Sequence, residues 1–228
     1  MKLHDRQGTP NAARIRIVLA AKGMNDDVEF VSVDLIAAEQ KQPAFLALNP
    51  IGKTPLLELE DGLVISESTA ITEYLDNLDG DPILTGRTPR EKAIIHMMQR
   101  RVEMLLLEPV DDYFHYGTSG LGPALRPWRK PDWSGAKEWG ERRGAEAVAN
   151  LPYFDAVLRE RPFLAGETFT MPDITLFASL VFAAAAGLPI APELTALAAW
   201  RARVEELPAV KDRSGQTLLP EDLARLSG

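Results

Sequence analysis

The fold is decided by residues 54–75, which read TPLLELEDGLVISESTAITEYL. Residues 56–60 and 63–65 are rich in apolar side chains and flank Asp61-Gly62, a pair that supplies the positive φ angles of a tight two-residue hairpin turn. These two segments are therefore predicted to be antiparallel strands. Residues 69–78 then repeat apolar side chains with the period of a helix, so the stretch predicts a hairpin followed by a helix.

Upstream of this stretch the sequence predicts a strand, a helix and a second strand. Residues 2–4 can form a short strand, and Thr9-Pro10-Asn11 opens a helix expected over residues 12–22. Residues 28–33 are rich in β-branched side chains, which favour a strand. The order strand, helix, strand, hairpin, helix is that of a thioredoxin-like α/β domain, which we predict over residues 1–79.

Downstream, the sequence predicts a linker and then an all-α domain. The turn-prone Asp79-Gly80-Asp81-Pro82 marks the boundary, so we expect a linker over residues 80–87 and the helical domain over residues 88–228. Thr88-Pro89-Arg90-Glu91 combines an N-cap, a proline at the first helical position and a glutamate at the third, which is the capping box of a long helix. Pro109 is expected to kink or end that helix.

Three further helices are predicted in this second domain. Residues 117–135 are rich in glycine and proline and are predicted to be a loop, which a polar helix follows. Thr170 and Asp173 form a second capping pattern, and it opens a nearly all-apolar helix that we expect at the centre of the domain. The last helix is expected over residues 192–207.

The composition argues against several classes of function. The chain has 25 basic and 33 acidic residues, and its net charge of −8 opposes binding to a nucleic acid. Cysteine is absent, which excludes disulfides and a protein thiol as nucleophile. The histidines, His4, His96 and His115, lack the spacing of ligands, so we expect no metal. Without a long apolar run or a signal peptide, we expect a cytoplasmic protein that does not enter membranes.

Four segments carry a resemblance to a known family: residues 49–57 (NPIGKTPLL), residues 67–75 (ESTAITEYL), residues 161–166 (RPFLAG) with the cap at 170–173, and residues 200–210. In this order and spacing they resemble the cytosolic glutathione transferases, and the similarity spans nearly the whole chain. Each motif alone is moderately specific. The similarity is weakest over residues 116–141, which in this family often shape the acceptor pocket.

The resemblance implies a site for glutathione, a tripeptide with two carboxylates, an amine and a thiol. In the family, the peptide bond before the proline that precedes the third strand is cis. Thr54 and Pro55 are therefore expected to form such a bond, which turns the Thr54 backbone toward the cysteinyl part of the tripeptide. Ser68 begins a helix, where its hydroxyl and free N–H groups suit the γ-glutamyl carboxylate. Glu67 is expected to accept from the γ-glutamyl amine.

Two more roles follow from the same resemblance. Lys53 and Gln40 fall where the family holds the glycyl carboxylate. Relatives often activate the thiol with a tyrosine, serine or cysteine near the start of the first helix, but residues 8–11 here are Gly-Thr-Pro-Asn. This pattern resembles the bacterial nu class, although the chain is otherwise similar to theta and zeta members. Thr9 is therefore expected to be the main thiol activator and Asn11 the second.

The acceptor substrate, a small electrophile, is expected to bind between the two domains. Tyr113 and Tyr116 lie near the end of the predicted long helix and are candidates for this acceptor pocket, although aromatic side chains at helical spacing more often lie in a core. The family also implies a two-fold homodimer through the helix that starts at Thr88 and the helix that follows Glu67.

Several functions stay open at this point. The leading prediction is transfer of the glutathione thiol to an electrophile. The missing cysteine also allows a glutathione-dependent disulfide or peroxide reductase, and similarity to the zeta class allows an isomerase. A non-catalytic interaction module of the same fold is a further alternative, but Lys53, Glu67 and Ser68 argue against it because such a module does not need a glutathione site.

Overall fold

The computed structural model describes residues 1–119, 122, 133–211, 216–217 and 219–221, and its first part is a mixed sheet covered by helices. The strands are β1 (Lys2–Asp5), β2 (Glu29–Ser32), β3 (Leu56–Glu58) and β4 (Val64–Ser66), in the order β2-β1-β3-β4. β1 is parallel to β2 and antiparallel to β3, which pairs with β4. The predicted α/β arrangement is confirmed.

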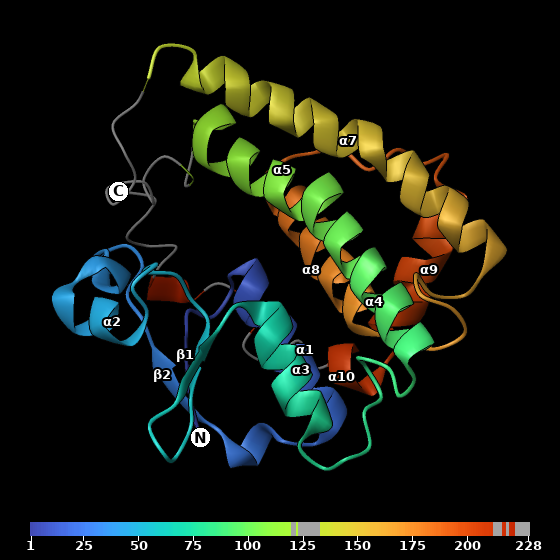
Figure 1. Cartoon of the computed structure of the whole chain (residues 1–228). Coiled ribbons are helices and arrows are strands. Elements are labelled where there is room, and N and C mark those ends of the chain that lie inside the picture. Colours follow the sequence, from blue (N-terminus) through green and yellow to red (C-terminus); the bar gives the residue numbers. More distant parts are fainter. Residues whose placement is uncertain (120–121, 123–132, 212–215, 218, 222–228) are drawn as a thin grey trace.

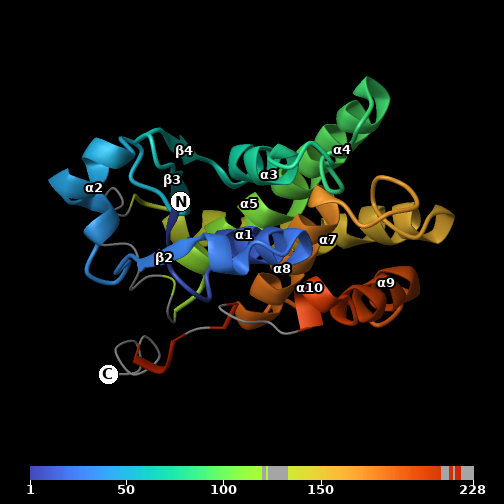
Figure 2. The ribbon, with the colours of Figure 1, turned by 90° about the horizontal axis from the view of Figure 1, so that it is seen from below.

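Helices lie on both faces of this sheet. α1 (Pro10–Lys22) and α3 (Ser68–Asn77) pack on each other on one face, and α2 (Pro43–Leu48) lies on the opposite side (Figures 1 and 2). The predicted strands and helices are present, with ends that differ by one or two residues. The sequence did not predict α2, which has only six residues.

The hairpin turn between β3 and β4 differs from the prediction. The N–H of Leu59 donates to the carbonyl of Leu63 at 2.8 Å, and the N–H of Gly62 donates to the carbonyl of Leu59 at 3.1 Å. Gly62 has φ 85°, whereas Asp61 is not among the residues with positive φ. The turn is therefore a three-residue loop with one left-handed glycine, and the two-residue turn was wrong.

The second part of the described chain is helical. It consists of α4 (Pro89–Val102), a π-helical turn (Glu103–Leu107), α5 (Glu108–Asp112), a second π-helical turn (Tyr113–Gly117), α7 (Ala136–Glu160), α8 (Met171–Ala185), α9 (Thr195–Glu205) and α10 (Pro208–Lys211). α8 is buried over residues 171–180 and lies among the others (Figure 1), as predicted. Most of the predicted loop over residues 117–135 lies outside the described residues.

The long helix, which consists of α4, α5 and the two π-helical turns (residues 89–117), does not end at Pro109, so that part of the prediction was wrong, whereas a kink there stays a prediction. A proline ring clashes with the carbonyl four residues earlier and has no N–H to bond to it. Here the preceding turn is π-helical, and the N–H of Glu108 donates to the carbonyl of Glu103. The carbonyl of Leu105 accepts instead from Asn150 Nδ2 of α7 at 2.9 Å. The wider turn and this side-chain donor together accommodate the proline.

The larger of two clusters of buried apolar side chains runs through both parts of the chain. It includes Leu3 of β1 and Ile17 of α1 together with Ile174 and Leu180 of α8, and α1 packs directly on α8 and α10. The domain boundary near residue 79 stays a prediction, as does the homodimer. No helix in the described ranges has both the length and the apolar character that a membrane crossing requires.

Both predicted capping boxes are present, and the one at Thr170 is buried. The Asp173 carboxylate accepts from the Thr170 N–H at 3.0 Å, from the Leu164 N–H at 2.9 Å and from Trp200 Nε1 at 3.1 Å. Burial raises the pKa of Asp173 to about 6 from an ordinary 3.8, against the opposing effect of these hydrogen bonds. The carboxyl group therefore binds its proton more tightly in the folded chain than in the unfolded chain.

We expect this shift to appear in the pH dependence of stability. Because the folded-state pKa is the higher one, the proton on Asp173 stabilises the fold at low pH, and that contribution is lost as the pH rises through about 6. Lowering the pH from about 7 to about 4.5 should stabilise the parent by about 2 kcal/mol relative to Asp173→Asn, measured by urea unfolding. If the difference in unfolding free energy between the two proteins does not change with pH, or changes in the other direction, the raised pKa of Asp173 is contradicted.

Candidate functional site

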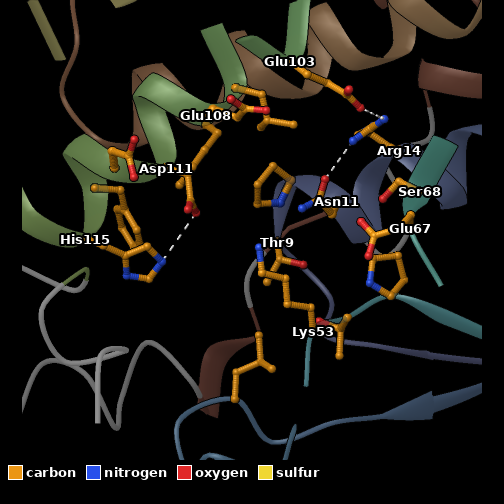
Figure 3. A pocket seen from close by; sticks show the side chains of 18 of the residues that line it. Thr9, Asn11, Arg14, Lys53, Glu67, Ser68, Glu103, Glu108, Asp111 and His115 are labelled. Carbon is orange, nitrogen blue, oxygen red and sulfur yellow. Dashed lines mark hydrogen bonds and ion pairs between the residues drawn. The ribbon is translucent and has the colours of Figure 1, made fainter. Parts of the chain in front are cut away.

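A cleft of about 1550 Å³ lies between the sheet and the long helix. One side is formed by the loop before α1, the segment before β3 and the start of α3. The other side is formed by α4, α5, the second π-helical turn and the end of α8. Figure 3 shows Thr9 and Asn11 between Lys53 and Glu67 on one side and Glu108, Asp111 and His115 on the other.

The cleft gathers most of the residues that the sequence predicted for the site. Those that line it are Thr9, Asn11, Gln40, Lys53, Thr54, Pro55, Glu67, Ser68 and Tyr116. Tyr113 is not among the lining residues. Its ring faces α7, where a Cβ on Gly144 would lie 2.5 Å from Tyr113 Cδ2. The structure therefore places Tyr113 against a neighbouring helix, and we do not retain it as a pocket residue.

The start of α3 presents several donors to the cleft. Glu67 occupies its N-cap position with φ 71°, an uncommon conformation for a residue other than glycine. Ser68 is buried, and no other described side chain or backbone group contacts its hydroxyl by a hydrogen bond. Thr54 and Pro55, which lie next to this helix start, form the expected cis peptide bond. An anion fits here because the first N–H groups of a helix lack intrahelical partners.

Gln40 has a buried side-chain amide that could pair with a polar ligand in the cleft. It is 2% exposed, yet neither atom of its side-chain amide has a hydrogen-bond partner among the described residues. Buried polar groups in folded proteins are nearly always paired, so this amide suits a polar ligand or an ordered water in the cleft. Lys53 is exposed beside it, and no described carboxylate pairs with its ammonium group.

The two candidates for thiol activation have different surroundings. The Thr9 hydroxyl donates its only proton to the carbonyl of Arg6 at 2.9 Å and makes no capping hydrogen bond to α1. Asn11 Oδ1 accepts from Arg14 Nη1 at 2.9 Å, while its NH₂ group has no partner among the described residues. Asn11 therefore offers a free donor to the cleft, whereas Thr9 in this structure does not.

Arg14 is a site residue that the sequence analysis missed. It is 4% exposed, and its Nη2 lies 3.2 Å from Glu103 Oε1 of the first π-helical turn. Burial lowers the pKa of the Arg14 guanidinium, and Glu103 partly offsets this effect. The available signal was an arginine among the buried apolar residues of α1, because buried arginines are rare unless they are paired.

The other half of the cleft is aromatic and acidic. Tyr116 packs on Trp133 and Trp139, with ring centroids 5.1 and 5.6 Å away. His115 is buried, and its Nε2 lies 3.5 Å from Asp111 Oδ1 (Figure 3). Sequence reasoning considered His115 only as a metal ligand, and no cluster of metal-binding side chains occurs in the described part of the chain.

Comparison with known proteins matches both parts of the chain to one family. Residues 1–77 match the model of the glutathione S-transferase N-terminal domain, and residues 134–208 match that of the C-terminal domain. The chain is 49% identical to glutathione S-transferase 2 of Saccharomyces cerevisiae over 211 residues, which are 92% of this chain and 88% of that protein. The crystal structure of Gtt2 from S. cerevisiae superposes with a TM-score of 0.86, covering 93% and 99% of the two chains. Maleylacetoacetate isomerase of Pseudomonas aeruginosa is 39% identical over 95 residues, 41% of this chain and 44% of that one.

Gly52 shapes the part of the cleft that contains Gln40, and its substitution tests how tightly this loop is packed. Gly52 has φ 61°, and a Cβ there would lie 2.6 Å from the carbonyl oxygen of Gln40. Gly80 has φ 75° and nothing within 4 Å of the same position. Both alanine variants introduce left-handed strain of about 1 to 2 kcal/mol. We expect Gly52→Ala to cost about 1 kcal/mol or more beyond Gly80→Ala in urea unfolding, and equal costs would contradict the close packing.

Proposed function

Because the chain belongs to the glutathione S-transferase family, we propose that it is an enzyme that transfers the thiol of glutathione to a small electrophile. The observation that carries this proposal is the buried, unpaired amide of Gln40 in a cleft that also contains the start of α3. A polar peptide with a carboxylate at each end suits such a cleft. No described group of this chain supplies the partner that Gln40 lacks.

We assign the two ends of glutathione to the two ends of this polar surface. The γ-glutamyl carboxylate would bind the Ser68 hydroxyl and the first N–H groups of α3, while Glu67 accepts from the amine. The glycyl carboxylate would bind Lys53 and the Gln40 amide. The backbone of Thr54 would pair with the cysteinyl residue as an added strand does. This orientation directs the thiol toward the N-terminus of α1.

Thiol activation is assigned mainly to Asn11 and the N-terminus of α1. A free thiol has a pKa of about 8.5, so only a few per cent is ionised at neutral pH. The Asn11 NH₂ group can donate to the thiolate, and the helix dipole favours a negative charge at the same place. The thiol proton leaves to solvent, and the thiolate forms a bond to carbon as a leaving group departs or as a conjugated double bond takes up a proton.

The aromatic part of the acceptor half suits an apolar electrophile. Phe114 and Phe182 pack edge to face with centroids 5.0 Å apart, and both line the cleft together with Tyr116 and Trp133. Such rings bind flat or apolar groups by burial of surface. Tyr116 thus remains a candidate for contact with the acceptor.

We propose a cytoplasmic homodimer, whose interface would cover the exposed Met97 and Met104 of the long helix.

The absence of cysteine is also compatible with a second function, that of a glutathione-dependent reductase. A disulfide or peroxide reductase built on this chain would have to use thiols of bound glutathione alone. Turnover of haloarenes, isothiocyanates, disulfides, peroxides and maleylacetone with glutathione distinguishes these candidate activities. Faster turnover of haloarenes than of disulfides supports the transferase, and the opposite ranking supports the reductase. Turnover of maleylacetone alone would support an isomerase.

Binding of glutathione is the first test of the assigned site. At 100 times its dissociation constant, glutathione should stabilise the parent by about 2.7 kcal/mol, which raises the melting temperature. Glu67→Ala should reduce this effect, whereas Glu29→Ala, on an exposed strand outside the cleft, should not. If millimolar glutathione leaves the melting temperature of the parent unchanged, the chain is better explained as a non-catalytic module.

Substitution of Asn11 tests the assigned donor. Asn11→Ala should raise the pKa of the bound thiol by about 1 to 2 units and slow the reaction roughly 10 to 100 times near neutral pH. Asn11→Asp should raise this pKa further, because a carboxylate then faces the sulfur. Thr9→Val should change it little, since the Thr9 proton is directed to Arg6. The readout is thiolate absorbance near 240 nm, and a larger shift in Thr9→Val than in Asn11→Ala would refute the assignment.

A further inference from the structure

We propose that Arg14 is a positioning residue that holds the side-chain amide of Asn11 with its NH₂ group toward the cleft. This inference rests on the proposed function, because it concerns the group that would stabilise the glutathione thiolate. Arg14 itself need not touch the tripeptide. Its role would be to decide which end of the Asn11 amide meets the sulfur.

The geometry leaves only one orientation for the amide. Arg14 lies one helical turn after Asn11 on α1, and its Nη1 is 2.9 Å from Asn11 Oδ1. A guanidinium has five N–H donors and no acceptor, so the atom that faces it must be the amide oxygen. The NH₂ group then lies on the opposite side, where Asn11 lines the cleft (Figure 3). A free amide could instead turn its oxygen toward the sulfur and repel a thiolate.

The guanidinium is itself held from the other side. Its Nη2 donates to Glu103 Oε1 at 3.2 Å and lies 3.4 Å from Thr69 Oγ1. The same Glu103 oxygen accepts from Thr69 Oγ1 at 3.1 Å and from Gln99 Nε2 at 2.8 Å. Gln99 in turn accepts from Thr175 of α8 at 2.9 Å. Groups on α3, the long helix and α8 therefore fix Arg14, and through it the Asn11 amide.

Stability alone is a weak reason for this arrangement. A buried ion pair often contributes no more than well-packed apolar residues of similar volume, because both charges lose their hydration. The pair between Arg16 and Asp5 provides a comparison on the same helix. Arg16 donates to both carboxylate oxygens at 2.8 and 2.9 Å, but it neither contacts Asn11 nor lines the cleft. Of these two pairs on α1, the Arg14 pair is the one that contacts a side chain lining the cleft.

The test compares Arg14→Lys with Arg16→Lys, since each keeps the positive charge and loses the guanidinium fork. In Arg14→Lys the pKa of bound glutathione should rise by about 1 unit, and kcat/KM below pH 7 should fall about tenfold. Arg16→Lys should match the parent in both. In an Asn11→Ala background, Arg14→Lys should add less than about a twofold effect, because the positioned group is gone. Glutathione affinity, measured by calorimetry, should stay within about threefold in all variants.

Two outcomes overturn the inference and leave the proposed function standing. One outcome is that the thiol of bound glutathione has the same pKa in Arg14→Lys as in the parent. The other is that Arg14→Lys raises this pKa by the same amount in an Asn11→Ala background. In either case Arg14 only stabilises the packing of the helices. Should Arg14→Lys fail to fold, the double variant Arg14→Met with Glu103→Gln leaves neither an unpaired buried charge nor a donor for the Asn11 oxygen, and the same two criteria apply to it. A parent that binds no glutathione would overturn the proposed function itself and this inference with it.

Discussion

A buried ion pair joins α1 to the long helix beside the cleft. Arg14 and Glu103 lie 3.2 Å apart, and their side chains are 5% and 21% exposed. Removing one partner of such a pair costs about 3 to 5 kcal/mol, because the other charge is left without its counter-ion. The pair therefore helps to hold α1 against the long helix at the edge of the cleft. The orientation of the Asn11 amide in the cleft depends on this junction, because Arg14 donates to both Asn11 and Glu103.

The π-helical turns determine what the long helix presents to the cleft. A π turn adds one residue to the turn and so shifts the following side chains around the axis. The first, Glu103–Leu107, begins with the residue that binds Arg14 and accommodates Pro109 with the help of Asn150. The second, Tyr113–Gly117, includes His115 and Tyr116, which line the cleft, and Tyr113, which packs on α7. The two π-helical turns thus determine which side chains of the long helix face the cleft and which face the core.

The accuracy of the sequence analysis depended on whether the signal was local. The capping boxes at Thr88 and Thr170 placed two helix starts correctly, because N-cap chemistry is complete within four residues. The hairpin turn was wrong because Asp61-Gly62 is compatible with two loop lengths, and the pairing of Leu59 with Leu63 decides between them. The glutathione residues were predicted by resemblance to a family. The partners of Arg14 and the direction of the Thr9 hydroxyl could not be predicted from the sequence, because they depend on tertiary structure.

The central claim is that the cleft binds glutathione with its sulfur at Asn11. A crystal structure of the chain with glutathione tests this most directly. The account predicts the sulfur within about 3.5 Å of Asn11 Nδ2, the γ-glutamyl end at Ser68 and the glycyl carboxylate beside Gln40 and Lys53. A tripeptide bound elsewhere, or one whose sulfur turns away from the start of α1 toward solvent, would contradict it.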